Sequence, residues 1–176
     1  MNSESKTIKV AGIEMGGTFC SVCISEKIFN DSGLISEVKI VEKVKISNTG
    51  PQETLQNICD YLNQKEFQSI GIACFGPLNL NRSSPEYGSI TSTPKLAWQN
   101  FNVIKYLSEN LNNKNILQIN METDVNACAN SEFSLGNHGV RESLAYITVG
   151  TGVGVGLVIN GKTVHGLVHP EGGHQK

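Results

Sequence analysis

The sequence has little charge, few aromatic residues and no long apolar run. Of its 176 residues, 17% are charged and 6% are aromatic, and the formal net charge is −2. This balance provides no basic face, which argues against nucleic acid as the main partner. No apolar run approaches membrane-spanning length, and the polar start of the chain has no apolar segment of signal-peptide type. The 39% of hydrophobic residues predicts a globular chain with a core.

Cysteine occurs in an odd number and without a clear ligand pattern. The five cysteines are scattered through apolar segments, as expected for buried, reduced thiols in a cytoplasmic protein. Cys20 and Cys23 have the spacing of a redox or zinc pair. They lie in an expected strand, however, where residues three positions apart face opposite sides. We therefore expect both to be structural.

The first half of the chain reads as strands around one helix. Residues 7–15, 19–25 and 38–46 alternate as strands do, and the third is expected at a sheet edge. A helix begins at Pro51, which suits the first helical position, and a buried strand follows over 69–75. A Gly-Gly-Thr turn separates the first two strands. A dinucleotide-binding fold would place a helix after such glycines, so a strand there argues against it.

The second half begins with a long polar loop over residues 78–99. Trp98, the only tryptophan, lies near the loop's end and is expected to anchor it. Strands followed by helices, with polar or glycine residues at the strand ends, place the chemistry at the carboxyl edge of a sheet. The elements expected after the loop are a helix over 102–112 capped by Asn102, a strand over 116–121 and a helix over 125–135 closed by Gly136.

Glycines at every second position follow the apolar run over residues 144–149. They are Gly150, Gly152, Gly154 and Gly156. Glycine permits a close backbone approach, so that several N–H groups can point at one phosphate. Because the Gly-Gly-Thr turn also follows a strand, we interpret the two turns as grips for two phosphates. The alternative is a glycine-rich hairpin needed only for close strand packing.

Residues 156–163 also match the P-loop pattern G-x-x-x-x-G-K-[ST] literally. A true P-loop lies between a strand and a helix. Here the intervening residues read as the core of a strand, and no helix start follows Lys162. Asn160 and Gly161 instead form the strongest short hairpin signal. We therefore interpret this match as a coincidence.

Asp124 is the candidate general base. It lies between a strand end and a helix start, where the helix N–H groups favour the ionised form. A hydroxyl that attacks phosphorus needs such a carboxylate to orient it and accept its proton. The alternative is that Asp124, or Thr123, is merely an N-cap.

Three histidines near the end of the sequence, together with Glu171, raise the possibility of a metal site. They are His165, His169 and His174. Zinc prefers a closed set of cysteine and histidine ligands. No cysteine lies near these histidines in the sequence, so their spacing alone does not predict a complete site.

Six stretches, taken together, resemble the ROK family of sugar kinases, within the actin-like and hexokinase-like ATPases, and look most like its bacterial fructokinases. They occur in the family's order and cover nearly the whole chain. The stretches are 12–18 (GIEMGGT), 71–77 (GIACFGP), 93–98 (TPKLAW), 123–127 (TDVNA), 149–154 (VGTGVG) and 169–174 (HPEGGH). Thr123 and the long loop over 84–98 look like the fructokinase branch rather than the glucokinase branch.

The resemblance implies an α/β fold, a ribonuclease H-like lobe with a mixed sheet and flanking helices. It implies a flexible lead over residues 1–6, an N-terminal kinase lobe over 7–135 and the start of a second lobe over 136–176. The implied activity is ATP-dependent phosphorylation of a hexose, with fructose to fructose 6-phosphate as the expected reaction. The alternative is a truncated, non-catalytic sugar-binding or regulatory remnant of such a kinase.

The resemblance also implies residue roles and ligands. When the family's residue roles are transferred to the matching positions, the first phosphate loop is Gly16, Gly17 and Thr18. The second phosphate loop is Gly150, Thr151, Gly152 and Gly154. The catalytic base is Asp124, the sugar-binding residues are Gly76, Asp124 and Glu171, and His174 is the first ligand of a structural zinc. ATP with Mg²⁺ follows from phosphoryl transfer, since charge on the transferring group must be neutralised. The implied partners are a sugar, ATP and a second copy in a homodimer, with no nucleic acid and no membrane.

Three features depart from the family pattern. Phe19 stands where the family usually has lysine after Gly-Gly-Thr, and Gly172 replaces a larger apolar residue. The sequence ends at Lys176, before the Cys/His cluster and the adenine-binding helices of the family. A complete zinc site and a complete ATP cleft are therefore expected only in a longer form.

Overall fold

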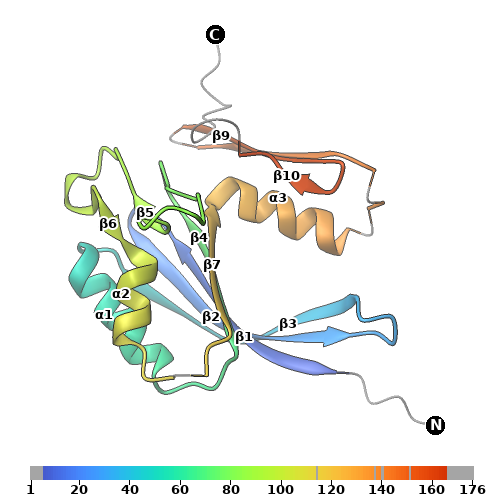
Figure 1. Cartoon of the computed structure of the whole chain (residues 1–176), viewed down its shortest axis with the longest axis horizontal. Helices are drawn as coiled ribbons and strands as arrows, with labels where there is room; N and C mark the ends of the chain where they lie inside the picture. Colours follow the sequence, from blue (N-terminus) through green and yellow to red (C-terminus); the bar gives the residue numbers. More distant parts are fainter. Residues whose placement is uncertain (1–5, 114, 137, 140, 151, 166–176) are drawn as a thin grey trace.

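The computed structural model describes residues 6–113, 115–136, 138–139, 141–150 and 152–165 (Figure 1). Its main layer is a five-stranded sheet in the order β3-β2-β1-β4-β7. The strands are β1 (Thr7–Met15), β2 (Phe19–Phe29), β3 (Ile35–Ser47), β4 (Ser69–Cys74) and β7 (Gln118–Thr123). β1, β4 and β7 are parallel, whereas β2 and β3 run antiparallel to their neighbours. The parallel strands therefore end at one common edge. This is the carboxyl edge at which the chemistry is expected from the sequence.

Two helices cover one face of this sheet. They are α1 (Pro51–Leu62) and α2 (Val103–Asn110), which lie side by side in Figure 1. Leu55, Ile58 and Leu62 recur at helical spacing and are completely buried against the sheet. Burying each such side chain contributes about 1.5–3 kcal/mol. The amphipathic pattern of α1 thus determines which face of the sheet becomes the core.

The long loop carries short elements and is anchored at its end. It contains β5 (Ser89–Ile90), which pairs with β6 (Phe101–Asn102), and a 3₁₀ turn over Leu96–Trp98. Trp98 is 2% exposed, and its indole Nε1 donates to Asn48 Oδ1 at 3.2 Å. Its ring meets Phe75 edge-on, with the ring centroids 5.7 Å apart. The predicted anchoring role of Trp98 is confirmed.

A second, three-stranded sheet lies beyond α3 (Asp124–Leu135). It consists of β8 (Leu144–Val149), β9 (Val153–Ile159) and β10 (Lys162–Thr163). α3 packs chiefly against β8 and β9, and it also contacts the main sheet (Figure 1). Asn160 and Gly161 have φ of 51° and 71° and turn the chain from β9 into β10. The segment is a hairpin, and its rejection as a P-loop is confirmed.

Most predicted boundaries agree with the structure, and the differences have local causes. β3 is an edge strand, as predicted, while β2 extends to Phe29 because it stays paired with β3 along its length. The helix after Asn102 ends at Asn110, because Leu111 is extended with ψ of 131°. The division into lobes at residue 135 stays a prediction.

The predicted structural role of the cysteines agrees with the structure. All five are free, and Cys20 is buried while Cys23 lies on the opposite side of β2.

Within the described residues, no helix is both long and apolar enough to cross a membrane.

Candidate functional site: the carboxyl edge of the main sheet

The carboxyl ends of β1, β4 and β7 bring the predicted site residues together. Met15 pairs with Cys74, and Cys74 pairs with Thr123. The first glycine turn therefore follows one strand, Gly76 follows the next, and Asp124 follows the third. Neighbouring strands lie about 4.8 Å apart, so the glycine turn and Asp124 are separated by roughly two such spacings. The three predicted site segments therefore lie along one edge of the sheet.

The first glycine turn has its carbonyl groups held from one side. Asn48 Nδ2 donates to the Gly16 carbonyl at 2.8 Å, and Lys95 Nζ donates to the Gly17 carbonyl at 3.0 Å. The backbone N–H of Asn48 donates to the Thr18 carbonyl at 2.9 Å. In a planar trans peptide the N–H points opposite to the C=O. The N–H groups of Gly17 and Thr18 therefore point away from Asn48 and Lys95, as an anion cradle requires.

The turn also shows why its first residue is glycine. The Gly16 N–H donates to the Phe19 carbonyl at 3.0 Å, which closes the turn. A Cβ at position 16 would lie 2.5 Å from that same carbonyl oxygen. No side chain fits there, so the turn itself requires glycine at position 16.

Asp124 is the first residue of α3, and it is exposed. The helix is capped by Thr123, whose Oγ1 accepts from the Asn126 N–H at 3.1 Å. Asp124 Oδ1 accepts from the N–H of Val125 at 2.9 Å. The N-cap alternative is therefore realised by Thr123, and Asp124 is not needed for it. A carboxylate on the first turn of a helix is favoured in its charged form.

Two charges of opposite sign act on the buried thiol at this edge. Burial raises the pKa of Cys74 well above its usual value, and the negative charge of Asp124 raises it further. The nearby positive charge of Lys95 opposes this increase in the pKa. Cys74 ends β4, between β1 and β7. Lys95 and Asp124 therefore both lie within electrostatic range of the middle of the edge.

The second glycine segment packs β9 against the start of α3. A Cβ at Gly154 would lie 2.7 Å from Val125 Cγ1, and a Cβ at Gly156 would collide with the Val125 carbonyl. A Cβ at Gly150, in contrast, meets nothing within 4 Å. The packing alternative thus accounts for Gly154 and Gly156. The phosphate role of Gly150, Gly152 and Gly154 stays a prediction.

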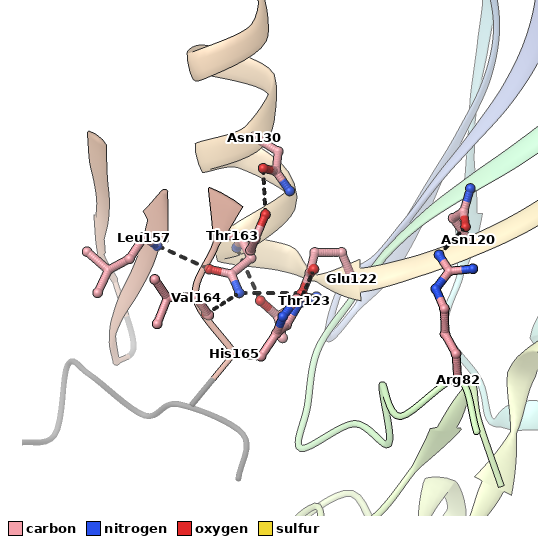
Figure 2. A network of polar contacts seen from close by, with 10 residues as sticks. Arg82, Asn120, Glu122, Thr123, Asn130, Leu157, Thr163, Val164 and His165 are labelled. Carbon is pink, nitrogen blue, oxygen red and sulfur yellow. Dashed lines mark hydrogen bonds and ion pairs between the residues drawn. The ribbon is translucent and has the colours of Figure 1, made fainter. Parts of the chain in front are cut away.

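Asn126 connects α3 to β7 and to the second sheet, and its partners Glu122, Leu157 and Val164 are labelled in Figure 2. It is 1% exposed, and its Oδ1 accepts from the Leu157 N–H at 3.1 Å. Its Nδ2 donates to the Val164 carbonyl at 3.2 Å and to Glu122 Oε1 at 3.4 Å. This network holds the first turn of α3, and therefore Asp124, in a defined place.

Further polar contacts lie beside that network in Figure 2. His165 Nε2 is 2.6 Å from Glu122 Oε2, so the segment after β10 is tied to the end of β7. Thr163 Oγ1 donates to Asn130 Oδ1 at 2.7 Å, which joins β10 to α3. The second sheet is thus joined by side chains to both α3 and β7.

Several site residues were not found by sequence reasoning. Asn126 and Lys95 lie in stretches that carry the family resemblance, and Asn48 lies outside them. None of the three has a local signal for its role, because each acts on a partner more than 30 positions away.

Three predicted site residues, Thr151, Glu171 and His174, lie outside the described residues. Among the residues that the structure does describe, no group of three or more His, Cys, Asp or Glu side chains could hold a metal ion. The zinc and sugar roles of Glu171 and His174 therefore stay predictions.

A cavity of about 580 Å³ lies next to this edge rather than at it. It is lined by residues of the sheet face opposite α1, among them Gly12, Glu14 and Gly71, and by Asn130 of α3. Neither glycine turn nor Asp124 lines it. The cavity is therefore a space beneath α3 and separate from the proposed reaction site.

The mixed sheet of this order, with its flanking helices, has the actin-like, hexokinase-like ATPase fold. Comparison with known proteins names the family. The model of the ROK family matches residues 10–176, so the chain belongs to the ROK family.

The similar proteins agree with this assignment. A fructokinase of Lactococcus lactis subsp. cremoris is 39% identical over 170 residues, which are 97% of this chain and 53% of that protein. A ROK family protein from Streptococcus pneumoniae TIGR4, solved in complex with sucrose, has a TM-score of 0.70 at 24% identity, covering 94% of this chain and 50% of that one. A ROK family glucokinase from Streptomyces griseus, solved with glucose and AMPPNP, has a TM-score of 0.67 at 22% identity. The match covers 96% of this chain and 50% of that glucokinase. The chain spans about half the length of the curated relatives it matches.

Proposed function

We propose that this chain is the N-terminal half of an ATP-dependent hexose kinase that converts fructose to fructose 6-phosphate. The observation that carries the proposal is the placement of Asp124 and the Gly16–Thr18 turn at one sheet edge. The relative from Lactococcus lactis supports fructose as the substrate, because it is named a fructokinase. A sugar hydroxyl beside Asp124 and a phosphate on the glycine turn would then face one another.

In the proposed reaction, the Asp124 carboxylate accepts a hydrogen bond from the 6-hydroxyl of the sugar. That contact orients the oxygen for attack and receives its proton as the new P–O bond forms and the bond to the nucleotide breaks. The N–H groups of Gly17 and Thr18 hold phosphate oxygens in place. Mg²⁺, when bound with ATP, neutralises charge on the phosphates.

The test is a kinase assay on the protein encoded by the longest reading frame, with fructose, glucose and mannose as acceptors. Asp124→Asn keeps the shape but cannot accept the proton, and it should lower kcat by about 10²- to 10⁴-fold. Asp31→Asn, in the turn between β2 and β3, is the matched control and should leave kcat unchanged. Full activity of Asp124→Asn would contradict the assignment. Sugar binding without any turnover would favour the non-catalytic alternative.

The remaining roles are part of the same proposal. Glu171 would bind sugar hydroxyls together with Gly76, and His174 would be one ligand of a zinc completed in a longer form. The glycines of the second turn would hold a second phosphate. A homodimer and a cytoplasmic location stay predictions.

A further inference from the structure

One lysine of the long loop reaches the first glycine turn from far away in the sequence. Lys95 Nζ lies 3.0 Å from the Gly17 carbonyl oxygen and 4.7 Å from the centre of the Phe75 ring. A Cβ at Gly17 would lie 2.9 Å from the same Nζ. The ammonium group therefore touches the backbone that forms the proposed phosphate cradle.

The charge of Lys95 is not matched by a carboxylate in the described part of the chain. None of the ion pairs found there includes it, and the hydrogen-bond acceptor of its Nζ is a neutral carbonyl. The turn supplies no cation of its own, because Gly-Gly-Thr is followed by Phe19, which is 52% exposed. Burial raises the pKa of Cys20, and the hydrogen bond from the Gly16 backbone and the positive charge of Lys95 oppose this increase. Lys95 thus places positive charge at the turn.

The backbone of Lys95 is fixed, while its side chain is long enough to move. The Trp98 N–H donates to the Lys95 carbonyl at 2.8 Å, and the Trp98 indole is bonded to Asn48. Asn48 in turn holds the Gly16 carbonyl. Lys95 and the turn are therefore two parts of one braced unit. The ammonium lies on the carbonyl side of the Gly17–Thr18 peptide, so contact with an anion on the N–H side requires the flexible four-carbon side chain to swing around the turn.

We propose that Lys95 is a phosphate-binding residue whose ammonium group contacts the terminal phosphate of a polyphosphate held by the Gly16–Thr18 turn. The inference rests on the proposed kinase function for its substrate, ATP. Charge-assisted hydrogen bonds to phosphate are stronger than neutral ones. A fixed cation at the transferring group also stabilises the charge spread over its oxygens during transfer. Lys95 would thereby bind ATP and assist the reaction from the side of the turn.

The binding test uses inorganic tripolyphosphate, which requires the phosphate grip but no adenine pocket. Isothermal titration calorimetry is carried out on the wild type, Lys95→Gln, Lys95→Arg and Lys105→Gln. Gln keeps a donor for the Gly17 carbonyl and removes the charge, so affinity should fall about tenfold or more. Arg keeps the charge, so the affinity of Lys95→Arg for tripolyphosphate should stay within about threefold of the wild-type affinity. Lys105 is exposed on α2 and serves as the control that should not change affinity.

A purely structural role of Lys95 would give a different result. If Lys95 only braces the turn, Lys95→Gln will bind as tightly as the wild type, which overturns the proposal. Salt provides a second readout, since removing a contacting charge should make binding less sensitive to ionic strength. A loss of affinity in Lys95→Gln with unchanged salt dependence also overturns it. Circular dichroism melts of each variant establish that the folds compared are the same.

The kinetic test separates this inference from the proposed function. In the full-length protein, Lys95→Gln should lower kcat/KM for ATP by about tenfold or more, and leave the KM for fructose within about twofold. If the wild type binds tripolyphosphate through Lys95 but phosphorylates no sugar, only the proposed function fails. If it phosphorylates fructose and Lys95→Gln is equally active and binds equally well, only the Lys95 inference fails. A wild type that does not bind tripolyphosphate overturns the inference and the phosphate role of the turn together.

Discussion

Replacing Gly156 with alanine should separate β9 from the first turn of α3. The added Cβ would collide with the Val125 carbonyl and lie 2.9 Å from the Asn126 N–H nitrogen. Both are backbone atoms, so no side chain can rotate out of the way. Overpacking of this kind costs about 1–3 kcal/mol. Separation also weakens the 3.1 Å bond from Leu157 N–H to Asn126 Oδ1, for about another 1 kcal/mol.

Part of this cost is offset in the unfolded state, because alanine has fewer backbone conformations than glycine, which favours folding by about 0.4–1 kcal/mol. The net expectation for Gly156→Ala is a loss of about 1–3.6 kcal/mol in the free energy of unfolding. Urea denaturation followed by circular dichroism measures this quantity from the transition midpoint and slope. Since Val125 is next to Asp124, we also expect kcat for sugar phosphorylation to fall, because a displacement of about 1 Å can cost roughly 10²-fold in rate.

Gly71→Ala is the matched control. Gly71 lies in the interior of β4, and a Cβ there would meet no atom within 4 Å. The same substitution should therefore leave the free energy of unfolding unchanged or slightly higher. If Gly156→Ala proves as stable as Gly71→Ala, the close packing of β9 on α3 is not what holds this part of the fold together, and the reasoning is refuted.

Two further predictions concern buried polar groups. Asn126→Ala removes the hydrogen-bond partners of the Leu157 N–H and the Val164 carbonyl. It should therefore lower the free energy of unfolding by about 2–4 kcal/mol. The control variant Asn130→Ala loses only its hydrogen bond from Thr163, so it should lower this free energy clearly less in the same urea titration. Burial raises the pKa of Cys59 to about 11. Because the folded pKa lies above the unfolded one, this thiol stabilises the fold fully below about pH 9, and the contribution is lost as the pH rises towards 11. Stability should therefore fall over that range, and less steeply in Cys59→Ala; an identical slope in the two proteins would contradict this.

Features set by neighbouring residues could be predicted from the sequence. Alternation indicated β1 and β3, Pro51 marked the start of α1, and Asn102 was identified as the cap of α2. The hairpin at Asn160 followed from the need for positive φ at two successive residues. These predictions succeeded because each depends on periodicity, capping or turn geometry within a few positions. The same elements led to the expectation that the chemistry lies at the strand ends, which stays a prediction.

What the sequence determined by itself was therefore the longer strands and helices, their order and the position of Asp124 between a strand and a helix, but not the short elements β5 and β6. Only the tertiary structure decided which distant groups meet there. Lys95 reaches Gly17 across 78 positions, and Asn126 bonds Leu157 across 31. Such contacts depend on how α3, the long loop and the second sheet pack on the main sheet, and no local pattern encodes that packing. The structure likewise decided that Thr123 is the cap, because only the position of its Oγ1 shows which of the two residues accepts from Asn126.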